Sequence, residues 1–176
     1  MNKLAKEYSN LGFDPEEIRA KYQAERDKRL RVDGNEQYVE IKDEFAHYSE
    51  DPYVERIERD AIDTEAEVVI IGGGFGGLLA GARCQQAGIE NVRIIEAGGD
   101  FGGTWYWNRY PGAQCDIEAY CYLPLLEELN YMPKEKYSYA PEIYSHSQRI
   151  AESFNLYEGA IFQTRVTDLR WDEDAA

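Results

Sequence analysis

The glycines of "GGGFGG", residues 72–77, have a spacing that indicates a binding site. They follow "EVVII", a short run rich in β-branched residues, and precede "LLAGARCQQAG", so Gly72-x-Gly74-x-x-Gly77 lies between a predicted strand and a predicted helix. In this pattern Gly72 permits a tight turn, Gly74 lets the backbone approach a pyrophosphate, and Gly77 lets helix and strand pack closely. The diphosphate of a dinucleotide would then meet the N–H groups at the helix N-terminus.

An acid completes this pattern. Glu96 ends "NVRIIE", a second predicted strand, about 20 residues after the last glycine, where a carboxylate accepts hydrogen bonds from a ribose 2′-OH. Because a carboxylate repels a 2′-phosphate, the site is predicted to favour FAD or NAD over NADP. The glycine motif alone does not separate FAD from NAD.

The run "GGTWYWNRYPGAQCD", residues 102–116, favours FAD. A second glycine pair here would let another backbone segment approach the cofactor. The aromatic residues that follow can pack on flat rings and exclude water. A long FAD molecule needs such a wall along its length, whereas an NAD dehydrogenase does not.

These residues need an α/β fold to position them. The strand, helix and strand of residues 67–96 form a β-α-β unit with parallel strands, the helix ends at Gly88, and "EVVII" is expected to be buried on both faces. A helix is predicted over residues 140–157 and a strand over residues 160–172. Because no returning strand follows, we expect the chain to be the N-terminal piece of a longer protein, with an incomplete Rossmann-like FAD-binding domain.

The domain organisation follows from a change in composition. Residues 1–63 are predicted to be a charged, helical N-terminal arm, with a helix in residues 13–31 that starts with Asp14 as N-cap and Pro15 at its first position. A flexible acidic extension is the alternative. Residues 64–176 are predicted to be the N-terminal part of the FAD-binding domain.

Charge and cysteine content exclude several classes of function. A net charge of −15 argues against a nucleic-acid partner. Cys84, Cys115 and Cys121 have no C-x-x-C spacing, and His47 and His146 have no ligand-like spacing, so we expect no metal site or disulfide framework and two surface histidines. The N-terminus has no signal-peptide pattern, and the longest apolar run is too short for a membrane span, so we expect a cytoplasmic location.

Three longer motifs extend the glycine pattern: "GGGFGG" with Glu96, "DFGGTWYWNRYPGAQCDIEAYCY", and "EKYSYAPEIYSHSQRIAESFNLY". Together they resemble the N-terminal segment of type I Baeyer–Villiger monooxygenases. The charged arm and "YCYLPLLEELNYMP" resemble the subgroup with an extended N-terminus, which includes large-ring cycloalkanone monooxygenases. The resemblance covers residues 64–171. It implies FAD and NADPH as cofactors, and a ketone and O2 as substrates.

The resemblance also implies site residues. It implies FAD contacts at the glycines, at Glu96, in the aromatic run and near the end of the chain: Gly72, Gly74, Gly76, Gly77, Glu96, Gly103, Thr104, Trp105, Tyr106, Trp107, Tyr120 and Val166. Asp116 would be the catalytic residue beside the flavin, with Gln114 and Cys115 beside the nicotinamide cofactor. Gln114 stands where the family often has arginine.

Other functions remain open at this stage. A relative that oxygenates nitrogen or sulfur would share these motifs, and a non-catalytic dinucleotide-binding module would share the glycine pattern. A second glycine loop for NADPH and the downstream family signature do not occur in these 176 residues. We therefore expect the chain alone to be inactive on ketones, and its oligomeric state is not predicted.

Overall fold

The computed structural model describes residues 12–39 and 41–173, and the chain divides into two compact units at Ser49 and Glu50. The sequence indicated a division near residue 63 instead. Residues 50–63 belong to the second unit because their backbone and side chains bond to it: the Ile57 N–H, for example, donates to Gln163 Oε1 at 2.6 Å.

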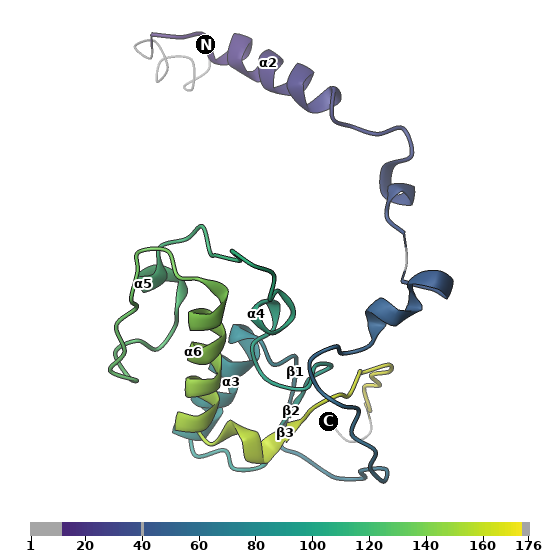
Figure 1. The fold of residues 1–176 in the computed structure, drawn as a ribbon, viewed down its shortest axis with the longest axis vertical. Helices are drawn as coiled ribbons and strands as arrows, with labels where there is room; N and C mark the ends of the chain where they lie inside the picture. The colour runs from purple at the N-terminus through teal and green to yellow at the C-terminus, as the bar shows by residue number, and fades with distance from the viewer. Residues whose placement is uncertain (1–11, 40, 174–176) are drawn as a thin grey trace. The chain divides into compact units, whose positions relative to one another are not determined.

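The first unit contains α2 (Pro15–Asp27) and two 3-10 helices, η1 (Gly34–Gln37) and η2 (Asp43–Ser49). The predicted helix start is confirmed, because the Asp14 carboxylate accepts a hydrogen bond from the Glu16 N–H at 2.9 Å and Pro15 is the first helical residue (Figure 1). The helix ends at Asp27, whereas the sequence predicted that it would continue through the basic residues that follow, up to residue 31.

The predicted β-α-β unit is confirmed in the second unit. Strand β1 (Val68–Ile71), helix α3 (Phe75–Gln86) and strand β2 (Val92–Ile95) follow one another, and the two strands pair in parallel with Val68 opposite Val92. Helix α3 begins at Phe75, so the last two glycines of the motif form its first turn instead of preceding it. Gly88, with a φ of 79°, follows the helix end as predicted.

Helix α6 (Ala140–Ser153) packs beside α3 on one side of the sheet (Figure 1). It leads through η3 (Leu156–Gly159) to β3 (Ala160–Ile161), which pairs in parallel with β2 and places β2 in the centre of the sheet. Two single-turn helices, α4 (Thr104–Trp107) and α5 (Ala119–Tyr122), lie between β2 and α6 in the chain.

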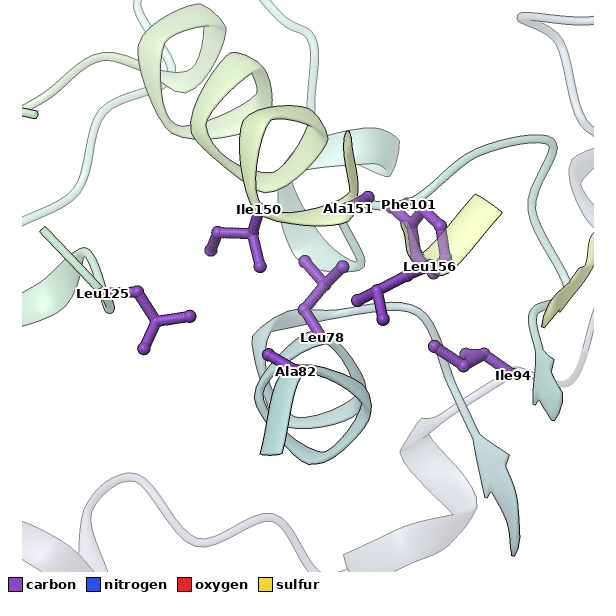
Figure 2. Close-up of a cluster of buried hydrophobic side chains, with 8 residues drawn as sticks. All are labelled: Leu78, Ala82, Ile94, Phe101, Leu125, Ile150, Ala151 and Leu156. Carbon is purple, nitrogen blue, oxygen red and sulfur yellow. The ribbon is translucent and has the colours of Figure 1, made fainter. Parts of the chain in front are cut away.

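The main core lies between the helices and the sheet. Figure 2 shows Leu78 of α3 pointing toward Ile150 of α6 and Leu156 of η3. The full group of buried apolar residues is Leu78, Ala82, Ile94, Phe101, Leu125, Ile150, Ala151 and Leu156. A helix–sheet sandwich of this kind fixes the strand ends, which carry the predicted site.

Two sequence predictions about the strands are wrong. Strand β1 is not buried on both faces: Val69 and Ile71 are 51% and 54% exposed, because the helices cover only the other side of the sheet. The strand predicted over residues 160–172 ends at Ile161. Gln163 adopts a left-handed φ of 50°, which interrupts an extended ladder.

Among the described residues, no helix is long and apolar enough to span a bilayer.

Candidate dinucleotide-binding site

The predicted site residues lie after the carboxyl ends of parallel strands. Gly72 follows β1, Glu96 follows β2, and Phe162 follows β3. Since carboxyl ends of parallel strands share one edge of a sheet, the three following loops gather there, where ligands of open α/β sheets bind. Hydrogen bonds join the loops: the Gly102 N–H donates to Gly73 O, and the Thr164 N–H donates to Glu96 O, both at 2.9 Å.

The first glycine loop leaves no room for a side chain at its closest packing point. A Cβ atom on Gly77 would lie 1.9 Å from the carbonyl oxygen of Gly72, and Gly72 itself has a φ of 97°. The turn therefore needs glycine at both positions. As a result, α3 starts directly behind the loop, and the N–H groups of its first turn are directed toward the loop side, where a diphosphate would bind.

The second glycine loop packs against the first. A Cβ atom on Gly103 would lie 2.8 Å from the Gly74 Cα atom, so the two backbones are in direct contact. A Cβ atom on Gly74 would meet only Gly103 Cα, at 3.5 Å, and one on Gly76 would meet nothing within 4 Å. The described fold would therefore accept a methyl group at Gly74 and Gly76, and glycine at such positions is typical of a loop whose backbone a diphosphate approaches.

Glu96 connects the loops. Its side chain is 7% exposed, and its carboxylate accepts the Gly73 N–H at 2.5 Å and the Gly98 N–H at 2.6 Å. A carboxylate offers about four lone-pair positions, so two backbone donors leave acceptor capacity for the hydroxyls of a ribose. The acid therefore shapes the glycine loop and can also bind a sugar.

The aromatic run divides into two environments. Trp105 and Tyr106 are buried, at 8% and 1% exposure, and the Trp105 indole N–H donates to the Tyr122 hydroxyl at 2.8 Å. Thr104 is exposed, and Trp107 is 39% exposed. The run was predicted to line FAD throughout. The side chains of Trp105 and Tyr106 pack in the interior, and the contacts of the whole run with FAD stay a prediction.

The segment that carries Asp116 is held by a second apolar group. Cys115 is buried together with Trp105 of α4, and Phe75 of α3 packs against the same group. The Cys115 N–H donates to Ser138 O at 3.0 Å, and the Gln114 side-chain amide donates to Tyr137 O at 2.8 Å. The neighbouring Asp116 is exposed, and within residues 12–39 and 41–173 it makes no hydrogen bond or ion pair.

Two further predicted residues lie at the edges of the second unit. Tyr120 is 56% exposed, and its hydroxyl donates to the Glu118 carboxylate, which raises the pKa of Tyr120. Val166 is half-buried and lies just beyond the segment that bonds to the Glu96 loop. No hydrogen bond between described residues joins Gln114, Asp116 or Tyr120 to the glycine loops, so their roles stay predictions.

Sequence reasoning missed Asp100. Its carboxylate accepts hydrogen bonds from the hydroxyls of Tyr144 and Tyr157 at 2.7 and 2.9 Å, and from the Gln148 amide at 2.9 Å. Burial, followed by this hydrogen bond to Asp100, raises the pKa of Tyr144 to about 12. Asp100 lies between two glycine pairs, in "GGDFGG", and its hydrogen bonds anchor the second glycine loop to α6.

His146 corrects another prediction. It was expected at the surface, but it is fully buried, with Nε2 2.7 Å from Pro124 O and the ring stacked on Tyr131. Its place on the inward side of α6, four residues before Ile150, explains the burial. His47 is exposed as expected.

Comparisons with known proteins agree with this geometry. Residues 70–135 match the family model described as an NAD(P)-binding Rossmann-like domain. A relative named Baeyer–Villiger monooxygenase ATR8, from Stachybotrys chlorohalonatus, is 53% identical over 167 residues, which are 94% of this chain and 27% of that protein. The chain thus spans about a quarter of the length of the curated relatives it matches.

Solved structures extend the match to the fold. The polycyclic ketone monooxygenase from the fungus Thermothelomyces thermophila superposes with a TM-score of 0.81 at 38% identity, over 91% of this chain and 27% of that one. The chain matches a segment of the Baeyer–Villiger monooxygenases. OTEMO, solved in complex with FAD and NADP, matches with a TM-score of 0.58 at 35% identity, over 64% of this chain and 22% of its own.

The two glycine loops and Glu96 fit a dinucleotide. The space beside Gly74 and Gly76 could take a diphosphate, and the remaining acceptor capacity of Glu96 could take a ribose. The Rossmann-like fold predicted from the sequence is confirmed, and so is the resemblance to this family.

Proposed function

We propose that this chain is the part of a Baeyer–Villiger monooxygenase that holds the diphosphate and adenosine ribose of FAD. The observation that carries the proposal is the contact between the two glycine loops, where a Cβ atom on Gly103 would lie 2.8 Å from Gly74 Cα. In the proposed complex, Gly72, Gly74, Gly76 and Gly77 border the diphosphate, and Glu96 accepts from the ribose. Gly103, Thr104 and Trp107 line the cofactor from the second loop.

The proposed reaction of the whole enzyme inserts one oxygen atom of O2 into a ketone, with NADPH as reductant, to give an ester or lactone. FAD supplies the redox chemistry and the activation of O2 when it is bound. The chain's own residues bind and orient it and exclude water from one side. Gln114 and Cys115 are proposed to border the nicotinamide, and Val166 to border the adenine.

Asp116 is proposed as the catalytic residue. Its exposure leaves the carboxylate free to meet a cofactor or a cationic partner, while the buried side chain of Cys115 fixes the backbone beside it. Paired with a cationic side chain of the whole enzyme, this carboxylate would tune the charge at the reacting centre. A cytoplasmic location is proposed as well, in keeping with three free cysteines.

A chimera tests this proposal. The chain replaces the matching segment of the Thermothelomyces polycyclic ketone monooxygenase, and the product of a cyclic ketone with NADPH and O2 is identified by mass spectrometry. We expect a lactone, and we expect Asp116→Ala to lower kcat about a hundredfold because a charge at the reacting centre is lost.

The matched control is Asp63→Ala, which removes the same charge from an exposed position. It should leave kcat unchanged. Oxidation of amines or sulfides without any lactone would contradict the proposed reaction. An unchanged kcat in the Asp116→Ala chimera would contradict the role of that residue.

A further inference from the structure

An extended segment upstream of β1, residues 51–59, contacts two of the three loops at the site, and we call it the strap. The Tyr53 hydroxyl donates to Trp107 O at 2.9 Å, and Arg59 donates to Phe162 O at 3.1 Å. The side-chain amide of Gln163 bonds to the strap backbone through both of its polar atoms. Oε1 accepts from the Ile57 N–H at 2.6 Å, and Nε2 donates to Glu55 O at 2.8 Å. The strap therefore joins the loop after β2 to the segment after β3.

Asp51 makes the strap's contacts with the loop after β2. Its Oδ2 atom accepts the Gly99 N–H at 2.8 Å and the Tyr106 hydroxyl at 2.5 Å. The Gly99 N–H also lies 3.1 Å from the Tyr106 oxygen, so the three groups form a closed triangle. Because Tyr106 is 1% exposed, this carboxylate satisfies a buried hydroxyl as well as a backbone donor.

The fit at Gly98 and Gly99 shows how closely the strap and the loop pack. A Cβ atom on Gly99 would lie 2.2 Å from Val54 Cγ2 of the strap, and one on Gly98 would lie 2.9 Å from the Tyr106 ring. The strap and the tyrosine thus occupy the space of both missing side chains. The Arg109 guanidinium lies over both tyrosine rings, 3.9 Å from the centre of the Tyr53 ring and 4.7 Å from the centre of the Tyr106 ring.

The neighbouring peptide, between Ala97 and Gly98, contacts the predicted ribose acceptor. The Gly98 N–H donates to one oxygen of Glu96 at 2.6 Å, and the Gly73 N–H donates to the other at 2.5 Å. A continuous path therefore runs from Asp51 through Gly99 and Gly98 to Glu96, and on to the first glycine loop. The path crosses two planar peptides, each held by a hydrogen bond to a carboxylate, and they are joined at Gly98, where the Tyr106 ring packs closely.

We propose that Asp51 is a positioning residue for Glu96, and through Glu96 for the ribose of the cofactor; this inference rests on the proposed FAD site. The strap holds the Gly98–Gly99 peptide before the cofactor arrives, so the Glu96 carboxylate need not reorient on binding. Preorganisation of this kind raises affinity by lowering the cost of ordering the site.

The test compares Asp51→Ala with Asp63→Ala in the whole chain. Amide hydrogen exchange at Gly98 and Gly99 is followed by NMR without cofactor, and the FAD dissociation constant is measured by flavin fluorescence. We expect Asp51→Ala to speed exchange and raise the dissociation constant, each about tenfold, because a charged acceptor is lost. Asp63→Ala should change neither by more than about twofold, because Asp63 is exposed and has no such partners.

Two further variants separate positioning from folding. Asp51→Asn keeps an acceptor oxygen and should restore most of the affinity, whereas Tyr106→Phe removes one donor, keeps the buried ring and should have an intermediate effect. Faster exchange with an unchanged dissociation constant would overturn the inference, and so would unchanged exchange in Asp51→Ala. If the unsubstituted chain binds no FAD, the proposed function fails, and the exchange rates still decide whether Asp51 holds the Glu96 loop.

Discussion

Single residues at this site divide into those that the fold needs and those that a ligand needs. At Gly77 a methyl group would collide with Gly72 O, so glycine is required before any cofactor binds. At Gly74 a methyl group would make an ordinary contact of 3.5 Å, so the packing of the described residues does not require glycine there. This difference makes Gly74 the better position for testing binding without disturbing folding.

The histidines give a prediction about pH. Burial lowers the pKa of His146 below its value of about 6.5 in the unfolded chain; it outweighs the hydrogen bond to Pro124 O, which raises the pKa, and the nearby Arg149 charge adds to the lowering. As the pH falls below about 6.5, the imidazole of His146 therefore takes up a proton in the unfolded chain before it does so in the folded chain. The free energy of unfolding decreases as the pH falls from about 6.5 toward the pKa of His146 in the folded chain.

Urea unfolding at pH 7.5 and pH 5.5 measures this effect. We expect the free energy of unfolding to fall between the two pH values in the unsubstituted chain, and to fall less in His146→Gln. His47→Gln is the matched control, since His47 is exposed and should leave the fall unchanged. An equal fall in all three proteins would contradict the assignment to His146.

At the scale of elements, the helix–sheet packing holds the strand ends that form the site. Leu78 is fully buried on α3 and meets residues from α6, β2 and η3. Replacement by alanine should cost about 3 kcal/mol of unfolding free energy, from lost burial and the cavity left behind. The exposed Leu169 provides the control, because Leu169→Ala should cost less than about 0.5 kcal/mol. Chemical denaturation measures both, and similar costs would show that this core does not support the unit.

The elements also show what sequence could predict. The βαβ unit, Gly88 after α3 and the Asp14 cap depend on local patterns, and each is found. The end of β3 could not be predicted, because Gln163 leaves the extended conformation to bond with the strap, more than a hundred residues earlier in the chain. The partial exposure of β1 could not be predicted either, because local hydrophobicity does not show which face of a strand is covered by distant parts of the chain.

The candidate site shows the same limit. Gly72, Gly74, Gly77 and Glu96 were predictable because their spacing follows from the geometry of one strand, turn and helix. Asp51, Asp100 and Arg109 were not, because their partners lie on other elements. Likewise, the pattern did not show that Tyr106 faces inward, since the direction of the ring depends on Asp51 and Gly99.

At the scale of the whole molecule, the chain matches about a quarter of a Baeyer–Villiger monooxygenase and contains the loops proposed to form one side of its FAD site. Three loops from parallel strand ends meet there, and the strap joins two of them. The central claim is that this edge of the sheet binds FAD. Catalysis by the whole enzyme, the strap's role and the position of Asp116 all depend on it.

A backbone NMR titration of the chain with FAD tests that claim most directly. We predict saturable shifts in residues 72–78, in residues 96–107 and around Val166, and a loss of those shifts in Gly74→Ala with an unchanged thermal unfolding midpoint. Absence of saturable shifts in the unsubstituted chain, or equal binding by Gly74→Ala, would contradict the account.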